Sequence, residues 1–197
     1  MEHNLCGMMT NYWHSCVSEK VARNSKRGAQ SDEIEIFYQM MMAVWFLCRN
    51  DQHRNTLNSQ ICGFLWLLIE NGHFRPHQGK RVSDCLKAAL GILYQFIRNE
   101  SESGRTSSWR SHVASIQGII DRQGFSRNIN ARATLILTYL WTEDQQKEAD
   151  HAENTITFLV LLIEECFQTE GGLHKDYGYS MMETMEGRSC LLNITMD

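Results

Sequence analysis

The sequence predicts an all-α protein. The 197-residue chain contains a single proline, Pro76, and proline breaks a helix in its interior, so long uninterrupted helices are expected. No segment alternates apolar and polar residues as a half-buried strand does, and no Asn-Gly or Asp-Gly pair separates two β-rich stretches. The clearest pattern is that of an amphipathic helix, in which apolar residues recur at i, i+3, i+4 and i+7. These residues are Val82, Cys85, Leu86, Ala89, Leu90, Leu93, Phe96 and Ile97.

The amphipathic helix at 82–97 follows a shorter, almost wholly apolar segment at 61–71. Ser83 and Asp84 stand where an N-cap residue and a first-turn acid belong. Asn71-Gly72 has the composition of a left-handed C-cap, which would end the first helix. The sequence therefore predicts a buried helix followed by an amphipathic helix that packs back on it.

Residues 61–72 read ICGFLWLLIENG, and residues 89–99 read ALGILYQFIRN. They resemble the middle helix (I-x-x-L-V-x-L-L-x-x-G) and the third helix (A-L-x-x-L-x-N-L) of an armadillo repeat. Residues 51–57, DQHRNTL, are similar to the family's short first helix, with Arg54 and Leu57 at matching places. The resemblance implies a right-handed α-solenoid of stacked helical repeats.

The sequence pattern that ends the third helix of a repeat recurs four times along the chain. The equivalent positions in these four segments are Phe46, Gln95, Tyr139 and Asn193. These positions are separated by 49, 44 and 54 residues, close to the roughly 40–47 residues of armadillo and HEAT repeats. The two longer intervals contain polar inserts at the same place in the repeat. We therefore expect one armadillo-like domain over 1–197, with units at about 1–50, 51–100, 101–142 and 143–197.

The remaining elements follow in order from apolar residues at helical spacing. After a first helix and a basic loop, the second helix begins near Ser31, where Asp32 and Glu35 have capping-box spacing. The Ser- and Gly-rich segment 100–108 reads as a loop. The other expected helices lie at 4–22, 107–123, 131–141, 154–168 and 180–196.

The C-terminal end of the last unit is apolar, with Leu191, Leu192 and Ile194. Terminal units of a solenoid usually carry a polar outer face. We therefore expect the chain to be part of a longer solenoid, or its end to be covered by a partner. Self-association through uncapped repeat ends is the other interaction that this pattern allows.

The net charge of −4 is small and spread along the chain, so no nucleic-acid partner is predicted. The longest apolar runs, at 61–69 and 156–163, fall short of the roughly 18 residues that span a bilayer, and no membrane span is predicted. The N-terminus has no basic segment followed by an apolar one, so we expect a cytoplasmic or nuclear protein.

Motifs for catalysis, cofactors and metals are missing from the sequence, which contains no P-loop, GxGxxG, GxSxG or HExxH pattern. The seven cysteines are odd in number and include no CxxC pair. His73 and His77 flank a proline-containing loop, and His14 and Cys16 are two apart on a helix and point apart. The sequence therefore predicts no enzyme, no cofactor and no metal site.

The armadillo resemblance implies a binding surface on the concave face, which third helices line. In the family an asparagine on this face clamps the backbone of an extended peptide, because an amide both donates and accepts hydrogen bonds. Only Asn193 keeps this asparagine, whereas Gln95 is a longer amide and Phe46 and Tyr139 are aromatic. The expected partner-binding residues are Tyr94, Gln95, Arg98, Tyr139, Trp141 and Asn193.

The predicted function is a non-enzymatic scaffold that binds a protein or peptide through this concave face. One alternative interpretation of the site is that Tyr139 and Trp141 simply pack between repeats. The alternative function is a compact all-helical regulatory factor, of a viral or host-defence type, that binds one partner helix in a groove.

Overall fold

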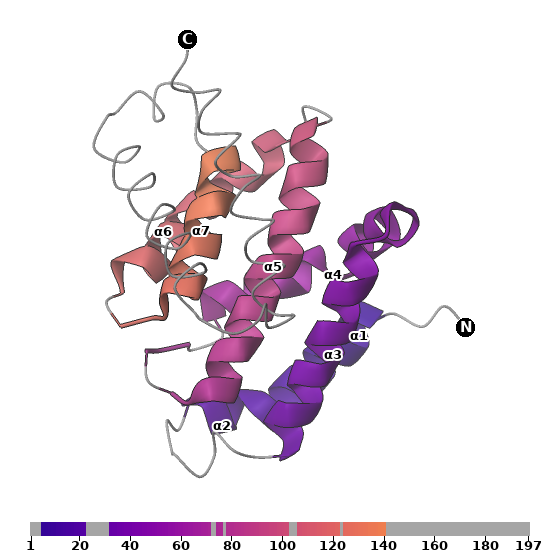
Figure 1. Ribbon diagram of the computed structural model, residues 1–197. Helices are drawn as coiled ribbons and strands as arrows, with labels where there is room; N and C mark the ends of the chain where they lie inside the picture. The colour runs from indigo at the N-terminus through magenta and orange to yellow at the C-terminus, as the bar shows by residue number, and fades with distance from the viewer. Residues whose placement is uncertain are drawn as a thin grey trace, which may run out of the picture.

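The computed structural model describes residues 5–22, 32–71, 74–76, 78–102, 106–122 and 124–140. Over these residues the protein is helical and has no strand (Figure 1), which confirms the all-α prediction for this part of the chain. No helix among them is both long and apolar enough to cross a membrane. The unit expected at 143–197 lies outside the described residues, and so do Trp141 and Asn193.

The first helical segment is α1 (Leu5–Tyr12), a π-helical turn η1 (Trp13–Val17) and α2 (Ser18–Ala22). Its buried residues are spaced four apart, and this spacing drifts about 40° per step around an ideal α-helix. The backbone N–H of Ser18 donates to the carbonyl of Trp13, five residues back, and this wider turn reduces the drift. The π-turn therefore helps to keep one stripe toward the core: Met9, Trp13, Val17 and Val21.

Helix α3 (Asp32–Cys48) is followed by α4 (Asp51–Asn71). The prediction of a separate short helix at 51–57 is wrong, because α4 is a single 21-residue helix. Its sequence has no glycine or proline between Leu57 and Ile61, and these two buried residues lie one turn apart on the same face. Arg54 fixes the α3–α4 turn, since its Nε donates to the carbonyl of Cys48 at 2.8 Å.

Helix α5 (Lys80–Glu102) starts earlier and ends later than predicted, and it extends into the segment expected to be a loop. Gly79 has a positive φ of 109° just before the helix, and the N–H of Ser83 donates to its carbonyl at 3.2 Å. Ser83 therefore lies in the first turn, and the prediction that it is the N-cap is wrong. The eight apolar residues predicted to share one face of this helix are all buried.

The segment expected to be one helix at 107–123 divides into a 3₁₀-helix η3 (Thr106–His112) and α6 (Val113–Asp121). Helix α7 (Arg127–Leu140) follows and is enclosed, since residues 131–138 are all buried. The helices form two layers (Figure 1): α3, α5 and α7 lie side by side in one, and α1, α4 and α6 follow one another in the other. The apolar core lies between these layers.

Candidate protein-binding face

Helix α3 is apolar around much of its circumference. No charged residue occurs between Glu35 and Arg49, although the solvent side of an amphipathic helix normally carries charges. The inner side of α3 faces the core with residues at helical spacing, which are Ile34, Phe37, Met41, Val44, Trp45 and Cys48. Four apolar residues of α3 lie outside this inner side and are exposed, namely Ile36, Ala43, Phe46 and Leu47.

The opposite side of α3 is exposed. Exposed fractions are 49% for Ile36, 71% for Phe46 and 43% for Leu47, and these are large apolar residues. At 3.6 residues per turn, these side chains and their exposed neighbours lie within an arc of about 120°. We call this surface the outer α3 face and define it by the exposed Ile36, Gln39, Ala43, Phe46 and Leu47 and the half-buried Met40.

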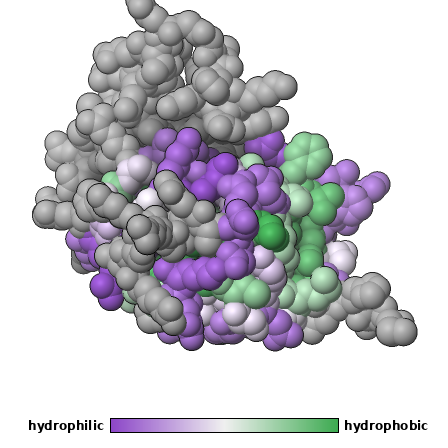
Figure 2. Space-filling model, turned by 90° about the horizontal axis from the view of Figure 1, so that it is seen from below, coloured by the Kyte–Doolittle hydropathy of each residue, from purple (hydrophilic) through white to green (hydrophobic). Residues whose placement is uncertain are grey.

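Apolar side chains also gather next to this helix. In Figure 2 most of the green surface lies on the right of the molecule, the side on which α1 and α3 lie in Figure 1, whereas hydrophilic residues cover much of the centre. Met8 of α1, which is 56% exposed, is the only large apolar residue outside α3 with comparable exposure in the described part of the chain. Within the part of the chain that the structure describes, three of the four exposed large apolar side chains therefore lie on one helix.

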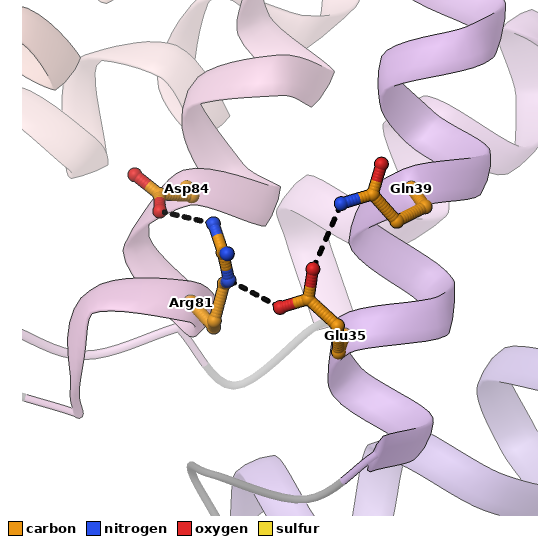
Figure 3. A network of polar contacts seen from close by, with 4 residues as sticks. All are labelled: Glu35, Gln39, Arg81 and Asp84. Carbon is orange, nitrogen blue, oxygen red and sulfur yellow. Dashed lines mark hydrogen bonds and ion pairs between the residues drawn. The ribbon is translucent and has the colours of Figure 1, made fainter.

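Polar contacts hold the beginning of α3 against α5 (Figure 3). The guanidinium of Arg81 bonds the carboxylate of Glu35 through Nε and reaches Asp84 through Nη1 at 3.4 Å. Gln39 Nε2 donates to the other oxygen of Glu35 at 2.8 Å. The hydrogen bond from Gln39 and the contact with Arg81 lower the pKa of Glu35 below its ordinary value of 4.5.

This pKa shift predicts a pH-dependent contribution of Glu35 to stability. A carboxyl group with a lowered folded-state pKa stabilises the fold above its unfolded-state pKa, and this contribution is lost as the pH falls through the folded-state value. Glu35→Gln should therefore lower the free energy of unfolding at neutral pH and have little effect well below pH 4.5. Urea unfolding of both proteins at the two pH values measures the difference, and an equal loss at both would contradict the contact.

The end of α3 is held by a close packing of three helices. The guanidinium carbon of Arg132 in α7 lies 4.5 Å from the centroid of the Trp45 ring. Gly91 of α5 allows this approach, since a Cβ at that position would lie 2.8 Å from the Trp45 ring and 2.5 Å from Arg132 Nη1. Helix α3 is thus held against α5 near its beginning by Glu35 and against α5 and α7 near its end by Trp45, so its outer face lies on a helix that is fixed at both ends.

A second aromatic cluster holds η3 onto α4. The His112 ring stacks on Trp66 with 4.1 Å between centroids and an interplanar angle of 6°, and His112 Nδ1 lies 2.8 Å from Glu70 Oε1. Trp109 adds a hydrogen bond from Nε1 to Glu100 of α5. These contacts fix η3 at the junction of α4 and α5, which is a structural role.

The residues predicted to bind a partner lie elsewhere, on α5 and α7. Tyr94 is buried with 1% of its surface exposed, and its ring packs edge-on against Tyr139 at 5.9 Å between centroids. Gln95 and Arg98 are half-buried on α5. The structure thus brings Tyr94 and Tyr139 together at the α5–α7 contact. The outer α3 face was not predicted as a site, although the charge-free stretch at 36–48 is a signal that could have found it.

The described cysteines are free thiols in apolar surroundings. Burial raises the pKa of Cys48 and of Cys62 to about 12, and the carboxylate of Glu100 adds to the shift at Cys62. Burial also raises the pKa of Cys85. These three thiols are therefore protonated at neutral pH and are poor nucleophiles. Among the described residues no group of His, Cys, Asp and Glu side chains could hold a metal ion.

Comparison of the chain with protein families, characterised proteins and solved structures finds no match. The function is therefore inferred from the outer α3 face and its surroundings.

Proposed function

We propose that this protein is a non-enzymatic protein-binding module whose docking surface is the outer α3 face. The single observation that carries the proposal is the exposure of Ile36, Phe46 and Leu47 on one side of one helix. Burying a large apolar side chain is worth roughly 1.5–3 kcal/mol, so leaving three exposed forfeits several kcal/mol. Clustered exposure of this kind is typical of interaction surfaces.

The chemistry of the face favours a protein over other ligands. Phosphate groups of nucleic acids are bound by Lys and Arg, and none occurs between Glu35 and Arg49. A row of apolar side chains along one helix is suited to packing against another apolar helix, which inserts its own ridges into the grooves between these side chains. We therefore propose an amphipathic helical surface as the ligand of the outer α3 face.

At the finer level of the fold, we propose that the two layers are part of an armadillo-like solenoid with about four units. The support is the alternation of α1, α3, α4, α5, α6 and α7 between the layers, as in stacked helical hairpins. Helix α4 replaces the two helices that were expected for the first part of the second unit. This favours a pair of helices, rather than three, as the repeating element. On this proposal, α3 is the first helix of its layer, and α5 is its only neighbour in that layer among the described helices.

A compact regulatory factor that binds one partner helix is the second candidate function. The observation that favours it is that, among the residues that the structure describes, the exposed large apolar side chains are confined to α3 and Met8. A surface that extended along the whole array would require similar residues on α5 and α7. A partner that contacts α3 alone would support the compact factor, whereas a partner that also contacts Gln95 would support the scaffold.

The proposed function is tested by affinity capture from cell lysate with matched baits. Ala43 and Ala114 are both exposed alanines within helices, on α3 and α6, so Ala43→Asp and Ala114→Asp carry the same substitution at different places. A partner should be retained by the wild type and Ala114→Asp and reduced at least about tenfold with Ala43→Asp. A partner bound equally by all three baits, with circular dichroism showing each folded, would contradict the assignment.

A third variant separates the two candidate faces. Gln95→Asp combined with Tyr139→Asp alters the predicted concave face and leaves α3 unchanged. Loss of the partner from this folded variant alone would place binding on α5 and α7 and would refute binding through α3.

A further inference from the structure

We propose that the acidic segment 143–150 of this chain folds back over α5 and α7 and occupies the side of these helices that points away from the core. We call this surface the α5–α7 outer side and define it by Lys87, Gly91, Gln95, Arg98 and Arg132. Two of these residues, Gln95 and Arg98, were predicted to bind a partner. The inference does not depend on the outer α3 face.

The position of the outer side follows from the geometry of α5. The eight buried apolar residues of this helix share one face, and Gly91 lies about 170° from the middle of that face. Lys87 and Arg98 lie within about 40° of Gly91. A Cβ at Gly91 would contact both the Trp45 ring and Arg132 Nη1. Trp45 and Arg132 therefore meet over the side of α5 that faces away from its apolar face.

The outer side is covered. Arg132 is only 2% exposed and Trp45 only 7%, whereas Phe46 of α3, in the same layer, is 71% exposed. Residues 131–138 are buried around the whole circumference of α7. The described elements that pack closely on α7 are α5, α6 and η3, and they lie beside α7 or in the other layer. The burial of the outer side thus indicates a further covering segment, and the chain continues for 57 residues beyond α7.

The charge of the outer side favours the acidic segment as this cover. Lys87, Arg98 and Arg132 are cations, whereas the nearby Asp84 is paired with Arg81. A guanidinium as deeply buried as that of Arg132 is costly unless an anion neutralises its charge. Segment 143–150 contains four acids and one lysine, which are Glu143, Asp144, Lys147, Glu148 and Asp150.

The segment is long enough to reach Arg132. Helix α7 ends at Leu140, eight residues or about 12 Å of helix after Arg132. An extended chain advances about 3.3 Å per residue, so Glu148, eight residues beyond Leu140, has a reach of about 26 Å. It can therefore return along α7 and place its carboxylate against the guanidinium. A partner that binds the outer side must then displace the acidic segment of the chain itself.

Arginine-specific labelling of the whole protein with phenylglyoxal tests this contact. Replacing the four acids by amides should release the segment and make labelling of Arg132 at least about tenfold faster. The variant carries Glu143→Gln, Asp144→Asn, Glu148→Gln and Asp150→Asn.

The control for the labelling removes two acids outside the segment, with Glu164→Gln and Glu165→Gln. Arg132 should react as slowly in this control as in the wild type, and peptide mass spectrometry measures each rate. Fast labelling of Arg132 in the wild type would show that nothing covers the outer side. Equally slow labelling in the fourfold variant would show that the acidic segment is not the cover. Either result would overturn the proposal.

Hydrogen exchange tests the contact from the opposite side with a single substitution. Arg132→Met keeps a long side chain and removes the charge, so amides of segment 143–150 should exchange at least about tenfold faster, while those of α4 stay protected. Arg110→Met alters an exposed arginine of η3 and should leave the exchange unchanged. Equal exchange of the segment in the wild type and in Arg132→Met would refute the contact. Capture of a partner through α3 would be unaffected by that result.

Discussion

Replacing Phe37 with alanine is expected to lower the free energy of unfolding by about 3–5 kcal/mol. The side chain is fully buried on the inner side of α3. Its ring centroid lies 5.0 Å from that of Trp13 in the first helical segment and 6.2 Å from that of Phe64 in α4. The substitution leaves a cavity where three helical segments meet, and urea unfolding followed by circular dichroism measures the loss.

Phe46→Ala is the matched control for this prediction. The residue type and the helix are the same, but Phe46 is 71% exposed. Its replacement should change the free energy of unfolding by no more than about 0.5 kcal/mol when the protein is dilute and monomeric. Comparable losses in the two variants would contradict the assignment of inner and outer sides to α3.

Gly91→Ala is expected to lower the free energy of unfolding by about 1–3 kcal/mol, although alanine is the better helix former by up to about 1 kcal/mol. The added methyl would lie 2.8 Å from two atoms of the Trp45 ring. The end of the Arg132 side chain can move aside, but the ring is rigid and buried on the inner side of α3. Helices α3 and α5 must then separate, and the fold loses contact between them.

Gly63→Ala and Gly118→Ala are the controls for this clash. Both glycines lie within helices, and an added Cβ meets nothing within 4 Å at either position. The two variants should therefore gain about 0.5–1 kcal/mol from helix propensity alone. If Gly91→Ala were stabilising by the same amount, the close approach of α3, α5 and α7 would be refuted.

The sequence predicted the core-facing side of α5 correctly, although not the ends of the helix. Lys87, Gln95 and Arg98 interrupt the apolar residues on the other side, so the apolar period identifies the core-facing side without knowledge of the fold. The period did not show that the other side is half-buried, with Gly91 packed against Trp45 of α3. Helix α3 has no such marker between Glu35 and Arg49. Phe37 and Phe46 look equally suited to a core, and only the positions of the neighbouring helices show that one is buried and the other exposed.

Two predicted helix boundaries, the break after Leu57 and the start at Ser83, are also wrong because local residue types do not fix where a helix begins or ends. The break expected after Leu57 came from the family pattern, whereas nothing in the local sequence interrupts a helix there. Ser83 is a good N-cap by type, but Gly79 takes the positive φ before the helix and α5 begins one turn earlier. Capping residues indicate where a helix can begin, and tertiary contacts such as those of Arg81 decide between candidate positions.

Hydroxyl-radical footprinting of Phe46 and Leu47, in the free protein and in the complex that it forms, tests the central claim most directly. Both side chains should be modified readily in the dilute protein and protected in the complex. His112, which lies on η3 and is 28% exposed, should react equally in both states. Modification of Phe46 and Leu47 that is unchanged on binding would contradict a docking role for the outer α3 face.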